Sequence, residues 1–368
     1  MEKKTKVLAV NPGSTSTKIA LFEEYDELFS MTIYHPAEEL KRFGSIQDQL
    51  AYRRDAVERT MAEKGCAMSD VDVFSARGGS LYPAEGGTYK ITELLVDHAS
   101  RGLHGEHPAQ LASQICYAFA KKFDKPAFIV NPPDCDEFQD ISRVTGVKGI
   151  YRESHIHALN QKEIAVRFCK ERDLKYEDVN LVIAHLGGGI SVTAHQKGRM
   201  IDSNDIIRGS GPMTPTRAGD LPYMAVIDMA FSGLYTKKQL TDKLNRAGGF
   251  TDHFDVADAR DVVKKIEAGD KYAEVVARGM AYQNAKYIGA MAVAMKGKLD
   301  AIILTGGIGN NKYFTDIIQD YVGWISEVVI MPGEFELEAL AAGALRVING
   351  EEEAKIYSGV PVWQGFED

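Results

Sequence analysis

The stretch Val7-Leu-Ala-Val-Asn-Pro-Gly-Ser-Thr-Ser-Thr-Lys-Ile-Ala-Leu-Phe22 decides how this chain folds. Its first apolar run breaks at residues 11–18 into a turn rich in Gly, Ser and Thr, and a second apolar run follows. This pattern predicts a strand, a tight turn and another strand. The turn offers backbone N–H groups, hydroxyls, an amide and an ammonium, which together can hold phosphate oxygens. The order of a Walker A loop is absent, and a hairpin turn without a ligand is the competing interpretation.

The same pattern recurs once further along the chain, and a third segment shares its first half. Residues 179–194 form an apolar run, the turn Leu186-Gly-Gly-Gly189 and a second apolar run. The segment Asp300-Ala-Ile-Ile-Leu-Thr-Gly-Gly-Ile-Gly-Asn-Asn311 predicts a strand that ends in a glycine-rich turn. Glycine lets the backbone approach phosphates and an adenosine without a Cβ clash. Three such turns at strand ends predict two related lobes that face a nucleotide.

The composition is that of an ordinary globular protein and disfavours several partners. The chain has 368 residues, 45% hydrophobic and 26% charged, which is enough for about two domains with a large core. Its net charge of −9 disfavours nucleic acid and anionic membranes as partners. No apolar run approaches the ~20 residues of a membrane span, and the run at residues 7–10 is too short for a signal peptide.

The cysteine pattern points away from both metal and disulfide chemistry. The four cysteines are scattered and form no CxxC pair: Cys66, Cys116, Cys135 and Cys169. Neither a zinc site nor a disulfide framework is therefore predicted. Reduced thiols in a cytoplasmic protein are the simplest interpretation.

Hydrophobic periodicity predicts an α/β chain in which strands are followed by helices twice. Strands are expected within 1–35, 71–76, 127–130, 179–207, 301–305 and 328–331, and helices at about 45–65, 93–100, 108–123, 157–172, 223–232, 236–245, 258–268, 270–296, 312–322 and 336–348. The helix at 270–296 is apolar nearly all round near its end, which predicts burial. We expect an N-terminal lobe at 1–155 and a nucleotide-binding lobe at 156–344, with 345–368 as a candidate to rejoin the first lobe.

Longer motifs resemble those of the butyrate kinases, in the short-chain carboxylate kinase branch of the superfamily of acetate and sugar kinases, heat-shock chaperones and actin. The motifs are Asn11-Pro-Gly-Ser-Thr-Ser-Thr-Lys18, His155-Ile-His-Ala-Leu-Asn-Gln161, Ala184-His-Leu-Gly-Gly-Gly-Ile-Ser191, Gly211-Pro-Met-Thr-Pro-Thr-Arg-Ala-Gly219 and Leu304-Thr-Gly-Gly-Ile308. The resemblance covers nearly the whole chain. It implies a two-lobed, ribonuclease-H-like (actin-like ATPase) fold with mixed sheets flanked by helices. It also implies reversible transfer of phosphate from ATP to a short-chain carboxylate, with ADP, an acyl phosphate and Mg²⁺.

The resemblance also assigns roles to residues by position. The first phosphate loop, which faces the transferred phosphoryl group, would contain Asn11, Ser14, Ser16 and Lys18. The second, on the β-phosphate side, would contain His185, Gly187, Gly188 and Gly189, and the adenosine loop would contain Gly306, Gly307 and Gly309. Arg217 matches an arginine on substrate and transition state, and His157 matches a histidine that bonds the equatorial oxygens. Glu336 is the nearest match to a Mg²⁺-linked glutamate, and Glu338 competes with it.

Two positions depart from the pattern of this superfamily. Relatives usually carry Asp where this chain has Asn131, and that acid helps to fix Mg²⁺ in acetate kinase. Asp134 and Asp136 lie close enough in sequence to take over. The substrate arginine of acetate kinase stands a few residues earlier in its strand, whereas Arg77 directly precedes Gly78-Gly79, as in the butyrate branch. The resemblance thus makes Asn131 a candidate catalytic residue and Arg77 a candidate substrate-binding residue.

The implied chemistry asks for positioning and positive charge. Phosphoryl transfer needs little covalent work from the protein. A carboxylate with a pKa near ~4.3 is already ionised at neutral pH and needs no general base. The site should therefore be cationic, with Arg217, Lys18, Arg77 and a metal. A sugar or polyol kinase would need a placed Asp instead, for which Asp205 and the acids near residue 135 are candidates. A weakly catalytic actin-like ATPase is the third hypothesis.

Each candidate also has a structural interpretation. Arg217 could form a surface ion pair, His157 could cap a helix, His185 could pack at the end of its strand, and Lys18 could be a solvated strand lysine. Acids in the first turn of a helix, such as Glu336, commonly serve the helix dipole. The sequence does not give the acyl-chain length, the physiological direction or the size of an oligomer, although the resemblance implies a homodimer or a larger homo-oligomer.

Overall fold

A computed structural model describes residues 4–103 and 105–366 of the chain. The chain divides into two compact units. The first unit comprises the described residues within 1–136, 158–160 and 335–368, and the second comprises 137–157 and 161–334. The chain thus leaves the first unit after residue 136, returns to it briefly at 158–160 and rejoins it at 335. The sequence predicted a boundary at 155 and a return at 345. The outermost residues of the predicted lobes, 1–3 and 367–368, lie outside the described residues.

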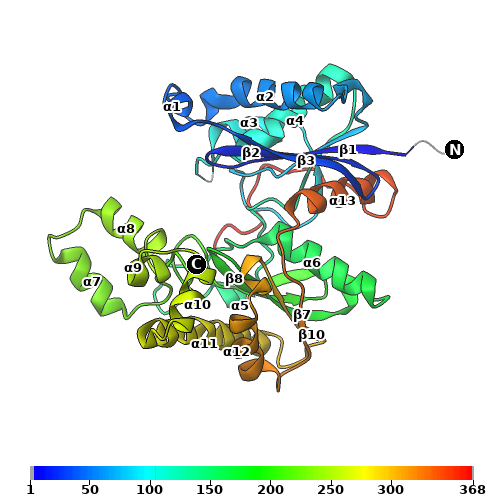
Figure 1. Cartoon of the computed structure of the whole chain (residues 1–368). Helices are drawn as coiled ribbons and strands as arrows, with labels where there is room; N and C mark the ends of the chain where they lie inside the picture. Colours follow the sequence, from blue (N-terminus) through cyan, green and yellow to red (C-terminus); the bar gives the residue numbers. More distant parts are fainter. Residues whose placement is uncertain (1–3, 104, 367–368) are drawn as a thin grey trace. The chain divides into compact units, whose positions relative to one another are not determined.

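The first unit is built on a six-stranded mixed sheet in the order β3-β2-β1-β4-β6-β5. Figure 1 labels its strands β1, β2 and β3. The strands are β1 (Lys6–Pro12), β2 (Ser16–Glu23), β3 (Asp26–Tyr34), β4 (Val73–Ala76), β5 (Thr88–Lys90) and β6 (Ala127–Val130). Strands β1, β4 and β6 run parallel, and β2, β3 and β5 are antiparallel to their neighbours. The hairpin β1–β2 closes at residues 12–16, where Gly13 N–H donates to the Ser16 carbonyl at 2.7 Å.

Helices cover both faces of this sheet because its strands bury alternate side chains on each face. The helices are α1 (Ala37–Leu40), α2 (Leu50–Glu63), α3 (Glu93–Arg101), α4 (Gln110–Phe123) and α13 (Glu336–Ile348). Leu8 and Val10 pack with residues of α2, α3 and α4, whereas Val7 and Ala9 pack with residues of α13. The last helix therefore completes the core of the N-terminal sheet.

The second unit contains a five-stranded mixed sheet in the order β11-β10-β7-β8-β9. Its strands are β7 (Asn180–Leu186), β8 (Ile190–Gln196), β9 (Arg199–Ser203), β10 (Ala301–Thr305) and β11 (Val328–Ile330). Its helices are α5 (Asp140–Arg143), α7 (Tyr223–Phe231), α8 (Lys237–Asn245), α9 (Phe250–Phe254), α10 (Ala259–Glu267), α11 (Lys271–Ala294) and α12 (Lys312–Val322). The first turn of α6 (Ala158–Glu171) belongs to the first unit and the rest of that helix to the second.

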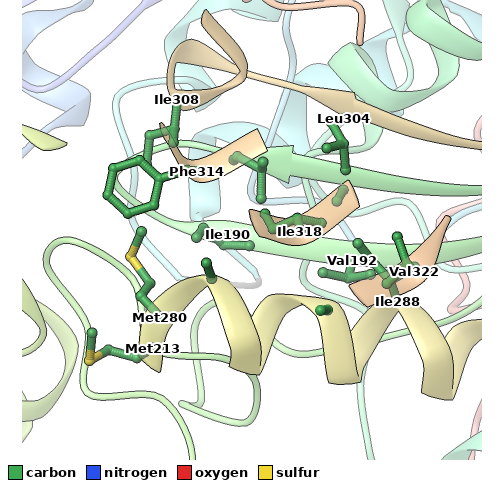
Figure 2. Close-up of a cluster of buried hydrophobic side chains, with 14 of the residues drawn as sticks. Ile190, Val192, Met213, Met280, Ile288, Leu304, Ile308, Phe314, Ile318 and Val322 are labelled. Atoms are coloured by element: carbon green, nitrogen blue, oxygen red, sulfur yellow. The ribbon is translucent and has the colours of Figure 1, made fainter. Parts of the chain in front are cut away.

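Helix α11 supplies one wall of the core of the second unit. Figure 2 shows Met280 and Ile288 packed with Ile190 and Val192 of β8 and with side chains of α12. The prediction that this helix is buried nearly all round is wrong, because Val293 is 75% exposed. Buried positions such as Ala277, Ala281 and Ile288 recur at the spacing of one helical face.

Four short elements were not predicted from the sequence. Strand β5 has three residues, helices α1 and α5 have four each, and helix α9 has five, so none of them gives a periodic signal. Every predicted long helix and strand is present. Within the described residues, none of the helices combines the length and hydrophobicity needed to cross a bilayer.

Candidate active site

In the first unit, the β1–β2 turn presents the polar residues that the sequence singled out. Asn11 and Lys18 are direct partners in the antiparallel register, so their side chains lie on the same face of the hairpin. Asn11 is buried, whereas Ser14 and Lys18 are exposed and Ser16 is half-buried. The turn thus displays hydroxyls and one ammonium beside a fixed amide.

Glu336, the first residue of α13, joins this face. It forms an ion pair with Arg77, and the Asn11 amide donates to its other carboxylate oxygen at 2.7 Å. Burial would raise the pKa of Glu336, but the charge of Arg77, the two hydrogen bonds and the charge of Lys18 outweigh it and lower the pKa below its usual value. Glu336 is therefore an ionised carboxylate held among Asn11, Lys18 and Arg77.

Arg53 of α2 supports the turn from behind, and sequence reasoning missed it. It is fully buried, and its guanidinium donates to the carbonyl oxygens of Gly13 (2.8 Å), Ser16 (3.0 Å) and Ser14 (3.1 Å). Its partners are carbonyl, amide and hydroxyl oxygens, with no carboxylate among the described residues. A buried cation is costly unless it is hydrogen-bonded, so the turn and Arg53 stabilise each other. The only sequence signal was an arginine on the apolar face of a predicted helix.

His107, just before α4, also escaped the sequence analysis. Desolvation and then the positive charge of Arg77 lower the pKa of His107. Its Nδ1 accepts from the Ala109 N–H at 3.2 Å. A histidine followed by the proline at the start of a predicted helix was the available signal.

Asn131 lies at the end of β6 with a left-handed φ of 38°, a conformation that Asn tolerates better than most residues. It is buried, and its side-chain oxygen accepts from the Gly87 N–H at 2.8 Å. Its own N–H donates to the Gly87 carbonyl at 3.0 Å. The side-chain oxygen of Asn131 is therefore engaged with the loop before β5.

In the second unit, the β7–β8 turn is shaped around Arg217. The Gly188 carbonyl accepts from Thr214 (2.6 Å) and Thr216 (2.9 Å), which ties the arginine loop to the turn. A Cβ at Gly189 would overlap the Arg217 guanidinium, so a larger residue there would have to displace that side chain. Burial lowers the pKa of Arg217, and Asp205 partly offsets this. Arg217 is thus a half-buried cation placed against the three-glycine turn.

Two further glycines hold the arginine loop and were missed in the sequence. A Cβ at Gly249 would overlap the Thr214 carbonyl, and one at Gly248 would overlap the backbone of Ala218. Gly249 also has a φ of 59°, which disfavours other residues. The loop that carries Arg217 is therefore packed directly against backbone.

His157 and His185 lie together in the second unit. Their rings stack with centroids 4.0 Å apart and planes at 17°. His157 Nδ1 is 2.8 Å from the Ser191 hydroxyl, and His185 Nε2 is 3.9 Å from a Glu334 carboxylate oxygen. The two histidines predicted from separate motifs thus form one pair beside the β7–β8 turn.

The third glycine turn contacts the second. Gly306 has a φ of 83°, and a Cβ there would overlap the backbone of Leu186. Gly309 lies close to Pro332, whereas Gly307 faces open space. Only Gly306 and Gly309 are therefore constrained by packing, and Gly307 has room for a ligand.

Asp205, a candidate base for a sugar kinase, is engaged in hydrogen bonds within the protein. Its carboxylate pairs with His155 at 3.0 Å and accepts from the backbone N–H groups of Ile207 and Arg208, each at 2.8 Å. Burial would raise the pKa of Asp205, but these bonds lower it below its usual value. A carboxylate held ionised this way is a weak proton acceptor.

The predicted site residues therefore fall into two groups. The first unit gathers Asn11, Lys18, Arg77 and Glu336. The second unit gathers His157, His185, the glycines of the β7–β8 turn, Arg217 and Gly306. Among the described residues, no group of three His, Cys, Asp or Glu side chains could hold a metal by itself.

Comparison with known proteins identifies the family. A model described as "Acetokinase family" matches residues 143–329, which is more than half of the chain. The chain belongs to the acetokinase family. It is 42% identical over 352 residues to "Probable butyrate kinase" of Clostridium botulinum, covering 96% of this chain and 99% of that protein. It is also 42% identical over 354 residues to "Butyrate kinase 2" of Clostridium acetobutylicum, with the same coverage.

Solved structures show the same fold for this acetokinase-family chain. Acetate kinase of Porphyromonas gingivalis matches with a TM-score of 0.75 at 18% identity, covering 94% of this chain and all of that one. A propionate kinase from Francisella tularensis matches with a TM-score of 0.70 at 17% identity, over 92% and 98% of the two chains. The predicted two-lobed α/β fold, the predicted family and the predicted carboxylate kinase activity are confirmed.

Proposed function

We propose that this chain transfers the γ-phosphoryl group of ATP to butyrate or a branched analogue, and that it runs the reaction in both directions. The observation that carries this proposal is the placement of Arg217 against the Gly187–Gly189 turn. A half-buried guanidinium with fixed geometry suits oxygen atoms of a carboxylate or phosphoryl group. Its backbone surroundings offer N–H groups for phosphate. The two butyrate kinases named above support the choice of acyl chain.

The proposed roles follow the two groups. Arg217, His157 and Lys18 stabilise charge on the transferred group, and Arg77 binds the substrate. The turns of both units bind the nucleotide, through Asn11, Ser14, Ser16, His185, Gly187, Gly188, Gly189, Gly306, Gly307 and Gly309. For Asn131 we propose a role in holding the loop at Gly87. Because the carboxylate is already ionised, the site needs no proton acceptor.

We propose Glu336 as the protein ligand for Mg²⁺. Magnesium in such sites takes one or two carboxylates and completes its shell with water and phosphate oxygens. The side chains present fit Mg²⁺, because Arg77 keeps the Glu336 carboxylate ionised and the Asn11 amide lies beside it. When bound, the ion would neutralise charge on phosphate oxygens. The chain's contribution is to keep this carboxylate charged and fixed.

The function is tested with purified protein, ATP, hydroxylamine and a panel of straight and branched carboxylates from acetate to hexanoate. Formation of acyl hydroxamate, greatest with four- and five-carbon acids, is the expected result. Hexoses in the same assay, followed by ADP release, serve as the comparison. Turnover of a hexose, or none with any carboxylate, would contradict the proposal.

We also propose a homo-oligomer in a reducing compartment such as the cytoplasm. Helix α7 is apolar, yet none of its residues is buried, and Tyr223 (76%) and Phe231 (87%) are largely exposed. An apolar surface of this kind is typical of a protein interface. None of the four cysteines, all of which lie within the described residues, forms a disulfide. Light scattering should give at least a dimer, and Phe231→Asp should yield monomers, whereas Trp324→Asp, at another exposed aromatic, should not. A monomeric wild type would contradict the oligomer.

A further inference from the structure

A buried chain of polar side chains runs behind His157 in the second unit. Ser191 on β8, Gln161 on α6 and His195 on β8 are all fully buried. Gln161 bonds both Ser191 and His195, and Ser191 bonds His157. None of these three was needed to explain the fold or the proposed reaction. Their hydrogen bonds nevertheless determine where one proton sits.

The orientation of the Gln161 amide is fixed first. Its nitrogen lies 3.1 Å from the Ser191 carbonyl oxygen, which can only accept, and 2.7 Å from the Ser191 hydroxyl. Both amide protons are therefore donated to Ser191. The amide oxygen must then accept from His195 Nε2 at 2.9 Å. Burial and the charge of Lys162 hold the pKa of His195 well below its usual value, so His195 is neutral and supplies that proton from Nε2.

The direction of the Ser191 hydroxyl follows. A hydroxyl oxygen has two lone pairs and one proton. The lone pairs of Ser191 accept from the Gln161 amide and, at 3.4 Å, from the backbone N–H of His157. Its proton is left for His157 Nδ1 at 2.8 Å. A neutral imidazole carries one proton, so an accepting Nδ1 requires a proton on Nε2.

We propose that Gln161 and Ser191 are positioning residues that hold His157 in the tautomer protonated at Nε2. This inference rests on the proposed function, in which His157 donates to oxygens of the transferred phosphoryl group. The pair ensures that His157 presents a donor to those oxygens even when it is uncharged. A donor oriented before the reaction stabilises developing charge without reorganising. The Ser191 carbonyl oxygen, which belongs to the sheet, fixes the direction of the hydrogen bonds from Gln161 through Ser191 to His157.

Nitrogen NMR of the full chain, labelled with ¹⁵N-histidine, tests the tautomer directly. Spectra are recorded well above pH ~6.5, the ordinary imidazole pKa, and His157→Gln identifies the signals of His157. We expect a protonated Nε2 and an unprotonated Nδ1. In Gln161→Glu, a carboxylate replaces the amide, so it cannot donate to Ser191 and instead accepts a hydrogen bond from the Ser191 hydroxyl. His157 must then donate from Nδ1, so its tautomer should switch.

Ser191→Ala provides a second variant, because it removes the hydroxyl that donates a hydrogen bond to His157 Nδ1. We expect loss of the single Nε2–H tautomer and a fall in kcat of about 10- to 100-fold, the loss seen when groups that orient a metal-bound histidine are removed. The KM for ATP should change little. Thr193→Val is the matched control: it removes a buried hydroxyl from the same strand, bonded to Ser203 instead. It should change neither the tautomer nor kcat.

The outcomes separate this inference from the proposed function. A wild-type His157 protonated at Nδ1 would overturn the inference even if butyrate is phosphorylated. A tautomer unchanged in both Gln161→Glu and Ser191→Ala would overturn it as well. The Nε2–H tautomer together with no turnover of any carboxylate would instead uphold the positioning pair and reject the proposed function.

Discussion

At the scale of single residues, the charge on Glu336 joins Asn11, Lys18 and Arg77 into one group. We expect Glu336→Gln to lower kcat by about 100-fold, because it removes the carboxylate proposed for Mg²⁺ and leaves Arg77 without its partner. Initial rates over a range of Mg²⁺ concentrations provide the measurement. Glu338→Gln, which changes the next acid in the first turn of α13, should stay near the wild-type rate and Mg²⁺ dependence. The reverse ranking would transfer the metal role to Glu338.

Arg53 illustrates a residue that acts through the backbone of others. Its guanidinium fixes three carbonyls of the β1–β2 turn, and small displacements of such loops can cost about 100-fold in rate. We expect Arg53→Met to lower kcat/KM for ATP by about that factor, and Arg53→Lys to lower it less. Arg54→Met, which removes the exposed neighbour paired with Asp55, serves as the control. An equal kcat/KM for ATP in the Arg53→Met and Arg54→Met variants would show that Arg53 does not support the β1–β2 turn in this way.

His35 makes the stability of this corner depend on pH. It bonds Thr17 at 2.9 Å, and burial followed by the charge of Arg53 lowers the pKa of His35 from 6.5 to about 4. Between those values the unfolded chain binds more protons than the folded one. The stability due to neutral His35 is therefore complete above pH ~6.5 and is lost as the pH falls towards about 4.

His35→Gln should flatten that loss, since Gln does not titrate and retains a hydrogen-bonding group near Thr17. Urea titrations of both proteins between neutral pH and pH ~4 give the free energy of unfolding across the window. Parallel curves for the wild type and the variant would show that His35 does not contribute.

At the scale of elements, the β7–β8 turn is matched to one side chain. Gly189→Ala should displace Arg217 and lower kcat by about 100-fold, because the added Cβ would overlap the guanidinium. Gly188→Ala meets no atom within 4 Å and should cost less. Steady-state kinetics with butyrate rank the two variants. A larger loss for Gly188→Ala would mean that open space at the turn, and not the position of Arg217, matters more.

Elements with a long periodic pattern were predictable from the sequence, and their contacts were not. The β1–β2 and β7–β8 hairpins follow from apolar runs that break at glycine-rich turns. The pairing of Glu336 with Arg77 joins residues 259 positions apart, which no local pattern encodes. The same holds for Gly249, whose importance comes from the Thr214 carbonyl it packs against. Helix α11 was misjudged because apolar residues such as Val275 and Val293 also lie on its exposed face.

At the scale of the whole molecule, the proposed reaction needs residues from both units. The first unit contributes Asn11, Lys18 and Glu336, and the second contributes His157 and Arg217. The motifs at residues 11–18 and 184–191 were visible in the sequence because each lies at the end of an apolar strand. The chain returns to the first unit at residue 335, directly before Glu336. The family resemblance drew attention to Glu336, but only the packing shows that α13 covers one face of the N-terminal sheet.

The most direct test of the account is the kcat for butyryl phosphate formation in Asn11→Ala, Arg217→Gln and the double variant, one substitution in each unit. Residues that act together on one transition state are strongly non-additive. We expect each single variant to lose about 100-fold and the double variant to lose far less than the product of the two. A wild-type kcat in either single variant, or fully multiplicative losses in the double variant, would contradict a single transfer step served by both units.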